Sequence, residues 1–224
     1  MSSTGRDVSG HRRLIAGVHR FRSEFYPGRQ ALFEKLGQRQ MPHTLFITCA
    51  DSRVPPEIIT QSEPGELFVC RNIGNIVPGY GEMLGGVSAV VEYACEALNV
   101  SDIVLCGHSD CGAMKGLLAG DNPQMRRMPT VASWLRNAEA ARTVVETMQP
   151  HLDPEAKIQA LVEQNVRLQL AHLRTHPSVA ARLAAGRLAL HGWVFGIDDG
   201  NVSVFDDDEE RLIPIEQVPL DEIG

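Results

Sequence analysis

Two short stretches decide the fold and the chemistry expected of this chain: Cys49-Ala50-Asp51-Ser52-Arg53 and Gly107-His108-Ser109-Asp110-Cys111-Gly112. The first follows an apolar, β-rich run over residues 44–48, and the second follows a similar run over residues 103–106. In each case Gly, Ser or Asp replaces the apolar residues, as happens where a buried strand ends in a turn. Together the stretches offer two thiols, one imidazole and one carboxylate, which are ligand types that a tetrahedral zinc ion accepts.

Strands and helices alternate along the rest of the chain. Strand-like runs cover residues 44–48, 66–71, 102–106, 188–197 and 202–205. Apolar residues at helical spacing or helix start signals mark residues 85–98, 110–118, 129–148, 153–173 and 178–185. This alternation predicts an α/β fold with a mostly parallel central sheet of about four strands, flanked by helices. Asp198-Asp199-Gly200-Asn201 is typical of a hairpin and predicts one antiparallel edge strand.

The N-terminal part of the chain is expected to form a helical arm over residues 11–38. Its apolar residues have helical spacing, interrupted near Pro27-Gly28, which predicts two helices. The arm precedes the first strand, so its apolar face needs another surface, and a partner subunit is a reasonable candidate. Residues 1–10 are polar and are expected to be disordered, and residues 206–224 are expected to form a C-terminal tail. We expect one domain over residues 1–224.

Composition excludes several classes of protein. A chain of 224 residues that is 43% hydrophobic is long enough for one large domain with a real core. The net charge of −7 and the lack of a basic tract disfavour a nucleic-acid partner. No apolar run long enough to span a membrane and no secretory signal are visible. Five cysteines in a chain of this size predict a reducing, cytoplasmic setting, with thiols used for metal or core.

The paired stretches predict a zinc site at one edge of the sheet. Ligands of open parallel sheets gather at the carboxyl ends of the strands, and Cys49 and His108 each end a strand. Cys111 starts a helix, where the dipole and free N–H groups favour a thiolate. Asp51 has two alternatives: it can take the fourth zinc position and close the site, or it can pair with Arg53 and leave that position to water.

Other residues with metal-binding chemistry have simpler interpretations. His172 and His176 have the i,i+4 spacing of a zinc pair but lack the glutamate after the first histidine, so a second metal site is disfavoured. His191 lies in a strand and is expected to be a core or interface histidine. Three further cysteines lie in apolar strand or helix contexts and are expected in the core: Cys70, Cys95 and Cys106.

The two stretches resemble the zinc signature of the β-class carbonic anhydrases. The likeness extends over roughly residues 30–205 and includes Arg71-Asn72-Ile73-Gly74-Asn75, Gly85-Gly86-Val87-Ser88 and His191-Gly192-Trp193. Within the family the chain resembles the plant-type branch, and it looks closest to bacterial members encoded beside cyanase. Phe46 stands where the other branch has a tryptophan of an inhibitory bicarbonate site. The resemblance therefore implies an enzyme without that bicarbonate switch.

The resemblance also implies an activity, further site residues and an assembly. The activity is reversible hydration of carbon dioxide to bicarbonate and a proton, by attack of zinc-bound hydroxide, with one zinc ion per subunit and a role in carbon utilization. Asp51, fixed by Arg53, would orient the hydroxide. The family's substrate-binding positions match Gln40, Phe68, Tyr93 and Gly112. Family members form homodimers by exchanging N-terminal helices, often within tetramers or octamers, so Gln40 would serve the partner's zinc.

Two alternatives stay open at this point. One is a structural zinc protein or non-catalytic subunit in which Asp51 binds the metal permanently. The other keeps the scaffold but hydrolyses a related cumulated substrate such as carbon disulfide. The Asp51–Arg53 pair and the apolar pocket residues favour the carbon dioxide hydratase.

Overall fold

This computed structural model describes residues 9–81, 85–206 and 211–218. The chain divides into two compact units, Met1–Met41 and Pro42–Gly224, and each is described by itself. The division falls three residues after the predicted end of the helical arm. None of the described helices combines the length and the apolar character that crossing a membrane requires.

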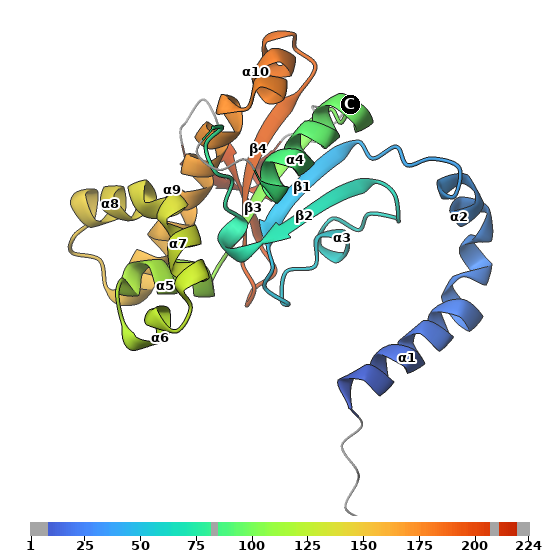
Figure 1. Cartoon of the computed structure of the whole chain (residues 1–224), viewed down its shortest axis with the longest axis horizontal. Coiled ribbons are helices and arrows are strands. Elements are labelled where there is room, and N and C mark those ends of the chain that lie inside the picture. The colour runs from blue at the N-terminus through green and yellow to red at the C-terminus, as the bar shows by residue number, and fades with distance from the viewer. Residues whose placement is uncertain (1–8, 82–84, 207–210, 219–224) are drawn as a thin grey trace, which may run out of the picture. The chain divides into compact units, whose positions relative to one another are not determined.

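The second unit is built on a six-stranded sheet in the order β2-β1-β3-β4-β5-β6 (Figure 1). The strands are β1 (Thr44–Cys49), β2 (Leu67–Asn72), β3 (Asp102–His108), β4 (Ala189–Phe195), β5 (Val202–Asp206) and β6 (Arg211–Pro214). The first four run parallel, and β5 and β6 are antiparallel to their neighbours. The predicted α/β fold and the hairpin between β4 and β5 are confirmed.

Strand β6 is the main difference from the predicted sheet. Its residues were assigned to a C-terminal tail, whereas Leu212 pairs with Phe205 and adds a second antiparallel strand. The strand is only four residues long, and its two central residues are half-buried. So short a run has too little alternation of apolar and polar residues to stand out in the sequence.

Helices cover the sheet. They are α3 (Pro56–Ile59), α4 (Gly86–Tyr93), α5 (Gly112–Ala119), α6 (Pro123–Arg126), α7 (Pro129–Leu135), α8 (Glu139–Met148), α9 (Pro154–Thr175) and α10 (Pro177–Ala184). Helix α4 continues into a π-helical turn over Ala94–Leu98. The single helix predicted over residues 129–148 is broken at the 3-10 turn Arg136–Ala138. There the side-chain amide of Asn137 donates to the carbonyl of Trp134 (2.8 Å), which competes with the regular helical ladder.

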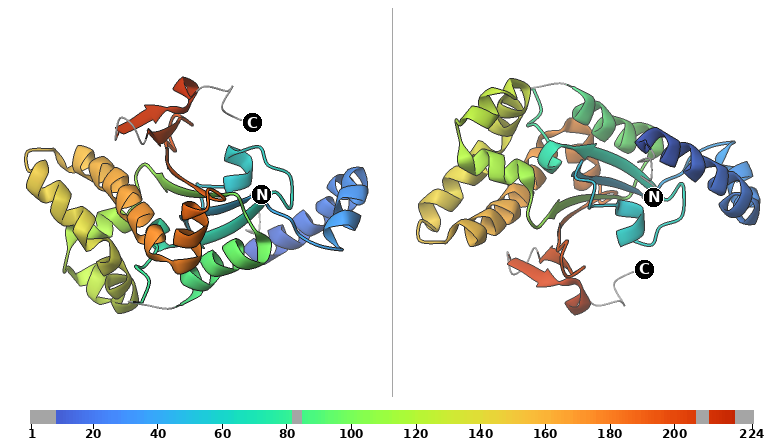
Figure 2. Two further views of the ribbon diagram at one scale, coloured as in Figure 1. Left: turned by 90° about the horizontal axis from the view of Figure 1, so that it is seen from above. Right: turned by 90° about the horizontal axis from the view of Figure 1, so that it is seen from below.

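The core lies mainly between the sheet and α9, which packs on β3 and β4 and lies beside α8 (Figure 2). All six residues of β1 are buried, as expected for a central parallel strand. Gly192 on β4 lets α9 approach closely, because a Cβ there would lie 2.8 Å from Cδ1 of Leu170. The three cysteines predicted in the core are buried: Cys70, Cys95 and Cys106.

The first unit is an arm of short helices, α1 (Gly10–Arg20) and α2 (Gln30–Leu36), joined by a π-helical turn (Phe21–Phe25) and a 3-10 turn (Pro27–Arg29). The predicted break near Pro27 is confirmed. No residue of α1 is buried, and Leu14 is 70% exposed. The disorder expected over residues 1–10 falls mostly on residues 1–8, which lie outside the described residues, and helix α1 begins at Gly10.

Candidate metal centre

Three donor groups converge at the carboxyl ends of β1 and β3. Cys49 is the last residue of β1, His108 is the last residue of β3, and Cys111 directly precedes α5. The parallel pairing of β1 with β3 brings both strand ends to one edge of the sheet. The two sulfur atoms and a ring nitrogen of His108 all lie within 4.8 Å of one another, and all three residues are buried.

The environment of His108 fits a metal ligand. Its Nδ1 lies 2.8 Å from the carbonyl oxygen of Ser109, and because a carbonyl only accepts, Nδ1 carries the proton. The other ring nitrogen, Nε2, therefore presents a lone pair. This atom is buried, and no group in the described part of the chain forms a hydrogen bond with it. A buried acceptor without a partner is unfavourable unless something else fills the position, and a metal ion does so.

The donor set suits zinc in particular. Two thiolates and one imidazole are soft and borderline ligands of the kind found in zinc sites. With zinc–sulfur bonds of about 2.3 Å, two sulfurs of a tetrahedral site lie about 3.8 Å apart. The observed spacing of the ligand atoms is compatible with that geometry. Three protein ligands leave the fourth position to water, which is the catalytic pattern.

The two thiols favour one thiolate even before a metal is considered. A hydrogen bond with the Cys111 side chain lowers the pKa of Cys49 well below its ordinary value, and the backbone N–H of Gly74 contributes as well. The same contact with Cys49 raises the pKa of Cys111. The N–H of Gly74 lies 3.4 Å from the Cys49 sulfur. Gly74 has a φ of +77°, and a Cβ there would lie 2.9 Å from Ala113, so glycine is required at this position.

Asp51 lies outside the group of three ligands and is held by Arg53. Nε of Arg53 donates to Oδ1 (2.9 Å), and Nη2 donates to Oδ2 (2.8 Å). The backbone N–H of Arg53 also donates to Oδ1 (3.0 Å). The side-chain hydrogen bond from Arg53 holds the pKa of Asp51 far below its ordinary value. Asp51 is therefore ionised, and of its two alternatives it adopts the pair with Arg53.

Sequence reasoning missed Asp110, which lies between two of the ligands. Nη1 of Arg53 donates to Oδ2 of Asp110 (3.0 Å), and Lys115 forms an ion pair with the same carboxylate. Asp110 has a φ of +56°, a left-handed conformation that aspartate tolerates better than most residues. Its position inside the second stretch could have indicated a role at the site. The direction of its side chain, however, depends on this backbone conformation, which the sequence does not reveal.

Within the second unit, Gly112 is the predicted substrate-binding residue that lies beside the ligands, whereas Phe68 and Tyr93 lie away from them. Phe68 pairs in register with Leu45, four residues before Cys49, which corresponds to roughly 13 Å along the strand. The Phe68 ring contacts that of Tyr93, with 5.9 Å between centroids. Gly112 opens α5 beside Cys111, whereas Gln40 belongs to the first unit.

The other histidines considered as metal ligands have hydrogen-bonding roles. Nδ1 of His172 lies 2.8 Å from the carbonyl of Val77, and Nε2 of His176 lies 3.3 Å from the Ser88 hydroxyl. His191 pairs with Asp102 (2.8 Å). Among the described residues, the one group with the spacing of a metal site is the group of Cys49, His108 and Cys111.

Known proteins resemble this chain in sequence and in structure. The family model described as carbonic anhydrase matches residues 44–202. A carbonic anhydrase of Pseudomonas aeruginosa is 52% identical over 208 residues, which are 93% of each chain. The solved structure of the β-carbonic anhydrase CcaA matches with a TM-score of 0.90 and 44% identity over 92% of each chain. The chain belongs to the β-carbonic anhydrases.

A more distant structural match is also informative. The tetrameric β-carbonic anhydrases of the ascomycete Sordaria macrospora match with a TM-score of 0.78 and 29% identity, over 87% of this chain and 95% of theirs. As a β-carbonic anhydrase the protein catalyses the reversible hydration of carbon dioxide with zinc as its cofactor. The alternative of a structural zinc protein is not supported.

Proposed function

We propose that Asp51 and Arg53 are the catalytic pair of this carbonic anhydrase, and that Cys49, His108 and Cys111 hold its zinc ion. The observation that carries this proposal is the two-pronged pairing of Asp51 with Arg53 beside a group of three buried ligands. Zinc in such a site supplies a Lewis acid that activates water near neutral pH. Because Asp51 is bound by Arg53, its carboxylate leaves the fourth coordination position free.

The hydrogen bonds of Asp51 indicate which of its atoms acts on the reactants. Oδ1 accepts two hydrogen bonds from Arg53 and Oδ2 accepts one. A carboxylate oxygen has two lone pairs, so Oδ2 retains an acceptor position. The carboxylate stays ionised, because Arg53 holds its pKa low, and it therefore acts as an acceptor only. Oδ2 accepts the hydrogen of the attacking oxygen and turns that oxygen's lone pair toward carbon dioxide.

Gly112 is proposed to bind the product side of the reaction. Its N–H belongs to the first turn of α5, where backbone N–H groups have no partner within the helix. This donor follows Cys111 directly, so it lies beside the metal ligands. It stabilises the negative charge that develops on oxygen as bicarbonate forms.

We propose that Gln40, Phe68 and Tyr93 complete the site of a second subunit. Phe68 and Tyr93 form an aromatic pair remote from the ligands of their own chain, and Tyr93 is 49% exposed. The exposed apolar face of α1 also needs a covering surface. A homodimer, alone or within a tetramer or octamer, provides both, and the tetrameric relatives from Sordaria macrospora support such an assembly.

The cellular setting is proposed from the thiols. All five cysteines are free and buried, as in proteins of a reducing compartment. We therefore place the enzyme in the cytoplasm, where it supplies or consumes bicarbonate in carbon utilization.

Stopped-flow hydration of carbon dioxide by the zinc-loaded protein tests the catalytic pair. Arg53→Ala should lower kcat/KM by about a hundredfold or more, since it releases the carboxylate that orients the attacking oxygen. Zinc content, measured by atomic emission, should stay at the wild-type level. Arg174→Ala, an exposed arginine on α9, is the matched control and should keep full activity. Loss of zinc in Arg53→Ala would instead give Arg53 a structural role.

A further inference from the structure

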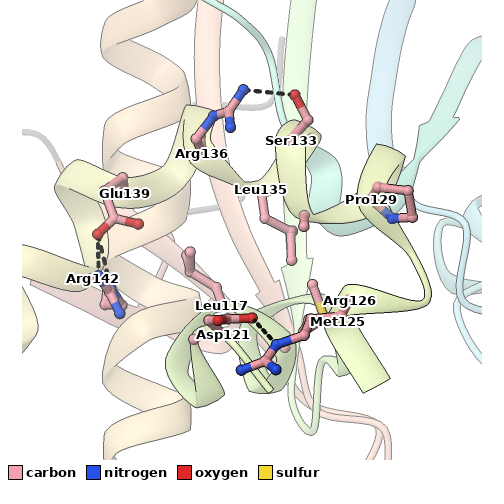
Figure 3. Close-up of a pocket in the computed structure, with 13 residues that line it drawn as sticks. Leu117, Asp121, Met125, Arg126, Pro129, Ser133, Leu135, Arg136, Glu139 and Arg142 are labelled. Carbon is pink, nitrogen blue, oxygen red and sulfur yellow. Dashed lines mark hydrogen bonds and ion pairs between the residues drawn. The ribbon is translucent and has the colours of Figure 1, made fainter. Parts of the chain in front are cut away.

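Outside the metal centre, a cavity lies between α5, α6, α7 and α8 (Figure 3). Its volume is about 430 Å³, which is within the range of small-molecule sites. The described residues that line it include neither the three metal ligands nor Asp51 and Arg53. The reaction therefore does not account for this cavity.

The cavity combines an apolar floor with a positively charged rim. Figure 3 shows Leu117, Met125 and Leu135 between three hydrogen-bonded pairs, and all three side chains are largely buried. Each pair contributes an arginine to the lining: Arg126 with Asp121, Arg136 with Ser133, and Arg142 with Glu139. The lining thus holds three guanidinium groups and two carboxylates, a surplus of one positive charge.

Arg136 carries that surplus. Its hydrogen-bond partner is the neutral hydroxyl of Ser133 (2.8 Å), whereas the two lining carboxylates pair with the other arginines. A guanidinium group has five N–H donors in a planar fork that matches phosphate and carboxylate oxygens. Arg136 therefore retains donors and charge for an anion, beside the apolar surface of Leu135.

We propose that this cavity binds a small amphipathic anion, with its charged group at Arg136 and its apolar body over Leu117, Met125 and Leu135. The shared chemistry is an oxyanion attached to a hydrocarbon or aromatic group. Inorganic phosphate offers only the first part, and a neutral apolar molecule offers only the second. An amphipathic ligand interacts with both the positive charge of Arg136 and the apolar floor of the cavity.

An occupant would contact α5, which begins beside one zinc thiol, and α7, which is hydrogen-bonded to the turn beside the other. Helix α5 begins next to Cys111, and its residues Gly116 and Leu117 line the cavity. On α7, Ser133 and Leu135 line the cavity, and Trp134 between them donates to the carbonyl of Ile73 (2.8 Å). The residue after Ile73 is Gly74, whose N–H donates to the Cys49 sulfur. Two short chains of contacts thus connect the cavity with the metal centre, and through them the ligand changes the rate of the reaction.

Isothermal titration of the zinc-loaded full chain with phenyl phosphate tests the binding. Arg136→Gln should weaken binding roughly tenfold, as expected for loss of a charge-assisted hydrogen bond. Gly116→Ala should weaken it as well, because the new methyl group lies in the cavity floor. That Cβ would lie 3.4 Å from the Met125 sulfur and 3.5 Å from Leu135, so the fold is kept. Arg127→Gln, a neighbouring arginine outside the lining, is the matched control and should bind like the wild type.

Several outcomes would overturn the proposal. Phenyl phosphate that does not bind at millimolar concentration contradicts the site itself. Binding that survives Arg136→Gln and Gly116→Ala but disappears with zinc removal belongs to the metal centre instead. Inorganic phosphate that binds as tightly as phenyl phosphate contradicts the role of the apolar floor.

The link to the metal centre has its own measurement. Saturating phenyl phosphate should change the rate of carbon dioxide hydration in the wild type. This change should disappear in Arg136→Gln when the rate with ligand is compared with the rate of the same variant without ligand. An equal change in both proteins means direct inhibition at the zinc and contradicts the link. A wild-type rate that does not respond, despite measured binding, contradicts it too.

Discussion

The two ends of the parallel sheet differ in how far one chain buries the side chains that lie there. At the carboxyl ends of β1 and β3, Cys49, His108 and Cys111 are at most 6% exposed and come from one chain. Toward the amino end of β2, Phe68 and Tyr93 form an aromatic pair of which Tyr93 is half exposed. One chain therefore supplies all three metal ligands, whereas its aromatic pair leaves half of Tyr93 exposed.

This difference follows from what each group needs. A zinc ion requires ligands fixed to within a fraction of an ångström, and strand ends in a buried parallel sheet hold them rigidly. An apolar pocket for carbon dioxide, as proposed for Phe68 and Tyr93, requires only that water be excluded, and a second subunit would do this by covering the exposed rings. The comparison predicts that changes at the first end act within a chain and that changes at the second end act across subunits.

The largest effect is expected from removal of a ligand. Cys111→Ser leaves two strong ligands, so zinc binding and activity should both be lost. The rate of carbon dioxide hydration should fall by about a thousandfold or more, out of the roughly 10⁶-fold or greater enhancement that is typical of enzymes. Zinc content by atomic emission and stopped-flow hydration measure the two losses. Cys70→Ser, at a buried cysteine outside the ligand group, is the control and should keep its zinc. A Cys111→Ser protein that retains zinc at full occupancy would remove Cys111 from the ligand set.

Tyr93→Ala tests the other end of the sheet. It should lower kcat/KM about tenfold, because the apolar surface against the substrate is reduced, while zinc content stays unchanged. Tyr93→Phe keeps the ring and should retain most of the activity. A matching loss in Tyr93→Phe would mean that the hydroxyl group, rather than the apolar ring, is required.

Mixed dimers then decide whether Tyr93 acts across subunits. If it does, a dimer of one Arg53→Ala chain and one Tyr93→Ala chain has one doubly defective site and one intact site. Mixing and reassembling the two variants should therefore restore activity above that of either alone. If each Tyr93 acts in its own chain, both sites stay defective, and activity remains at the mean of the two variants.

Much of the fold was predictable, because the parallel strands have strong local signals. β1 is rich in β-forming residues and buried along its whole length, and β3 is buried at every residue except its first, as expected of central parallel strands. What was missed depends on contacts distant in sequence or on single side chains. Strand β6 is defined by its pairing with β5, and the break between α7 and α8 is accompanied by the hydrogen bond of Asn137 to Trp134.

The same distinction applies to the site. Cys49, His108 and Cys111 were predictable as a group, because each lies where a strand ends or a helix begins. The choice of Asp51 between zinc and Arg53 was left open by the sequence, since both alternatives use the same five-residue stretch. The contact of Arg53 with Asp110 spans 57 positions and depends on the left-handed backbone of Asp110. Such a contact has no periodic signal in the sequence.

Substitution of Asp110, which lies near the metal ligands, is expected to have a smaller effect on activity. Asp110→Asn removes a charge that helps to hold Arg53 against Asp51, in an ion pair whose side chains are 44% and 52% exposed. Exposed ion pairs contribute little, because solvent screens them, so kcat/KM should fall by at most about fivefold. Lys115→Gln, which leaves the bond between Arg53 and Asp110 intact, should have less effect. A loss as large as that of Arg53→Ala would make Asp110 a full member of the catalytic group.

The smallest effect concerns His176, a buried polar residue outside the metal centre. Burial lowers the pKa of His176 from its ordinary value of about 6.5, so the folded protein holds the neutral ring. Neutral His176 donates from Nδ1 to the carbonyl of His172 and accepts at Nε2 from the Ser88 hydroxyl. The unfolded chain takes up a proton at higher pH than the folded chain does. The contribution of His176 to the free energy of unfolding is therefore fully present above about pH 6.5, and it decreases as the pH falls toward the lowered pKa.

Denaturant unfolding of the zinc-loaded protein between about pH 8 and pH 6 measures this decrease. Loss of zinc at the acid end affects wild type and variants alike, so the comparison between them isolates His176. His176→Gln should reduce the free energy of unfolding at pH 8, and it should flatten the dependence on pH. His151→Gln, an exposed histidine, should keep the wild-type dependence. If the free energy of unfolding of His176→Gln depended on pH as steeply as that of the wild type, the pH dependence would belong to the metal centre. The carboxyl ends of β1 and β3 would then be the part of the molecule most sensitive to acid.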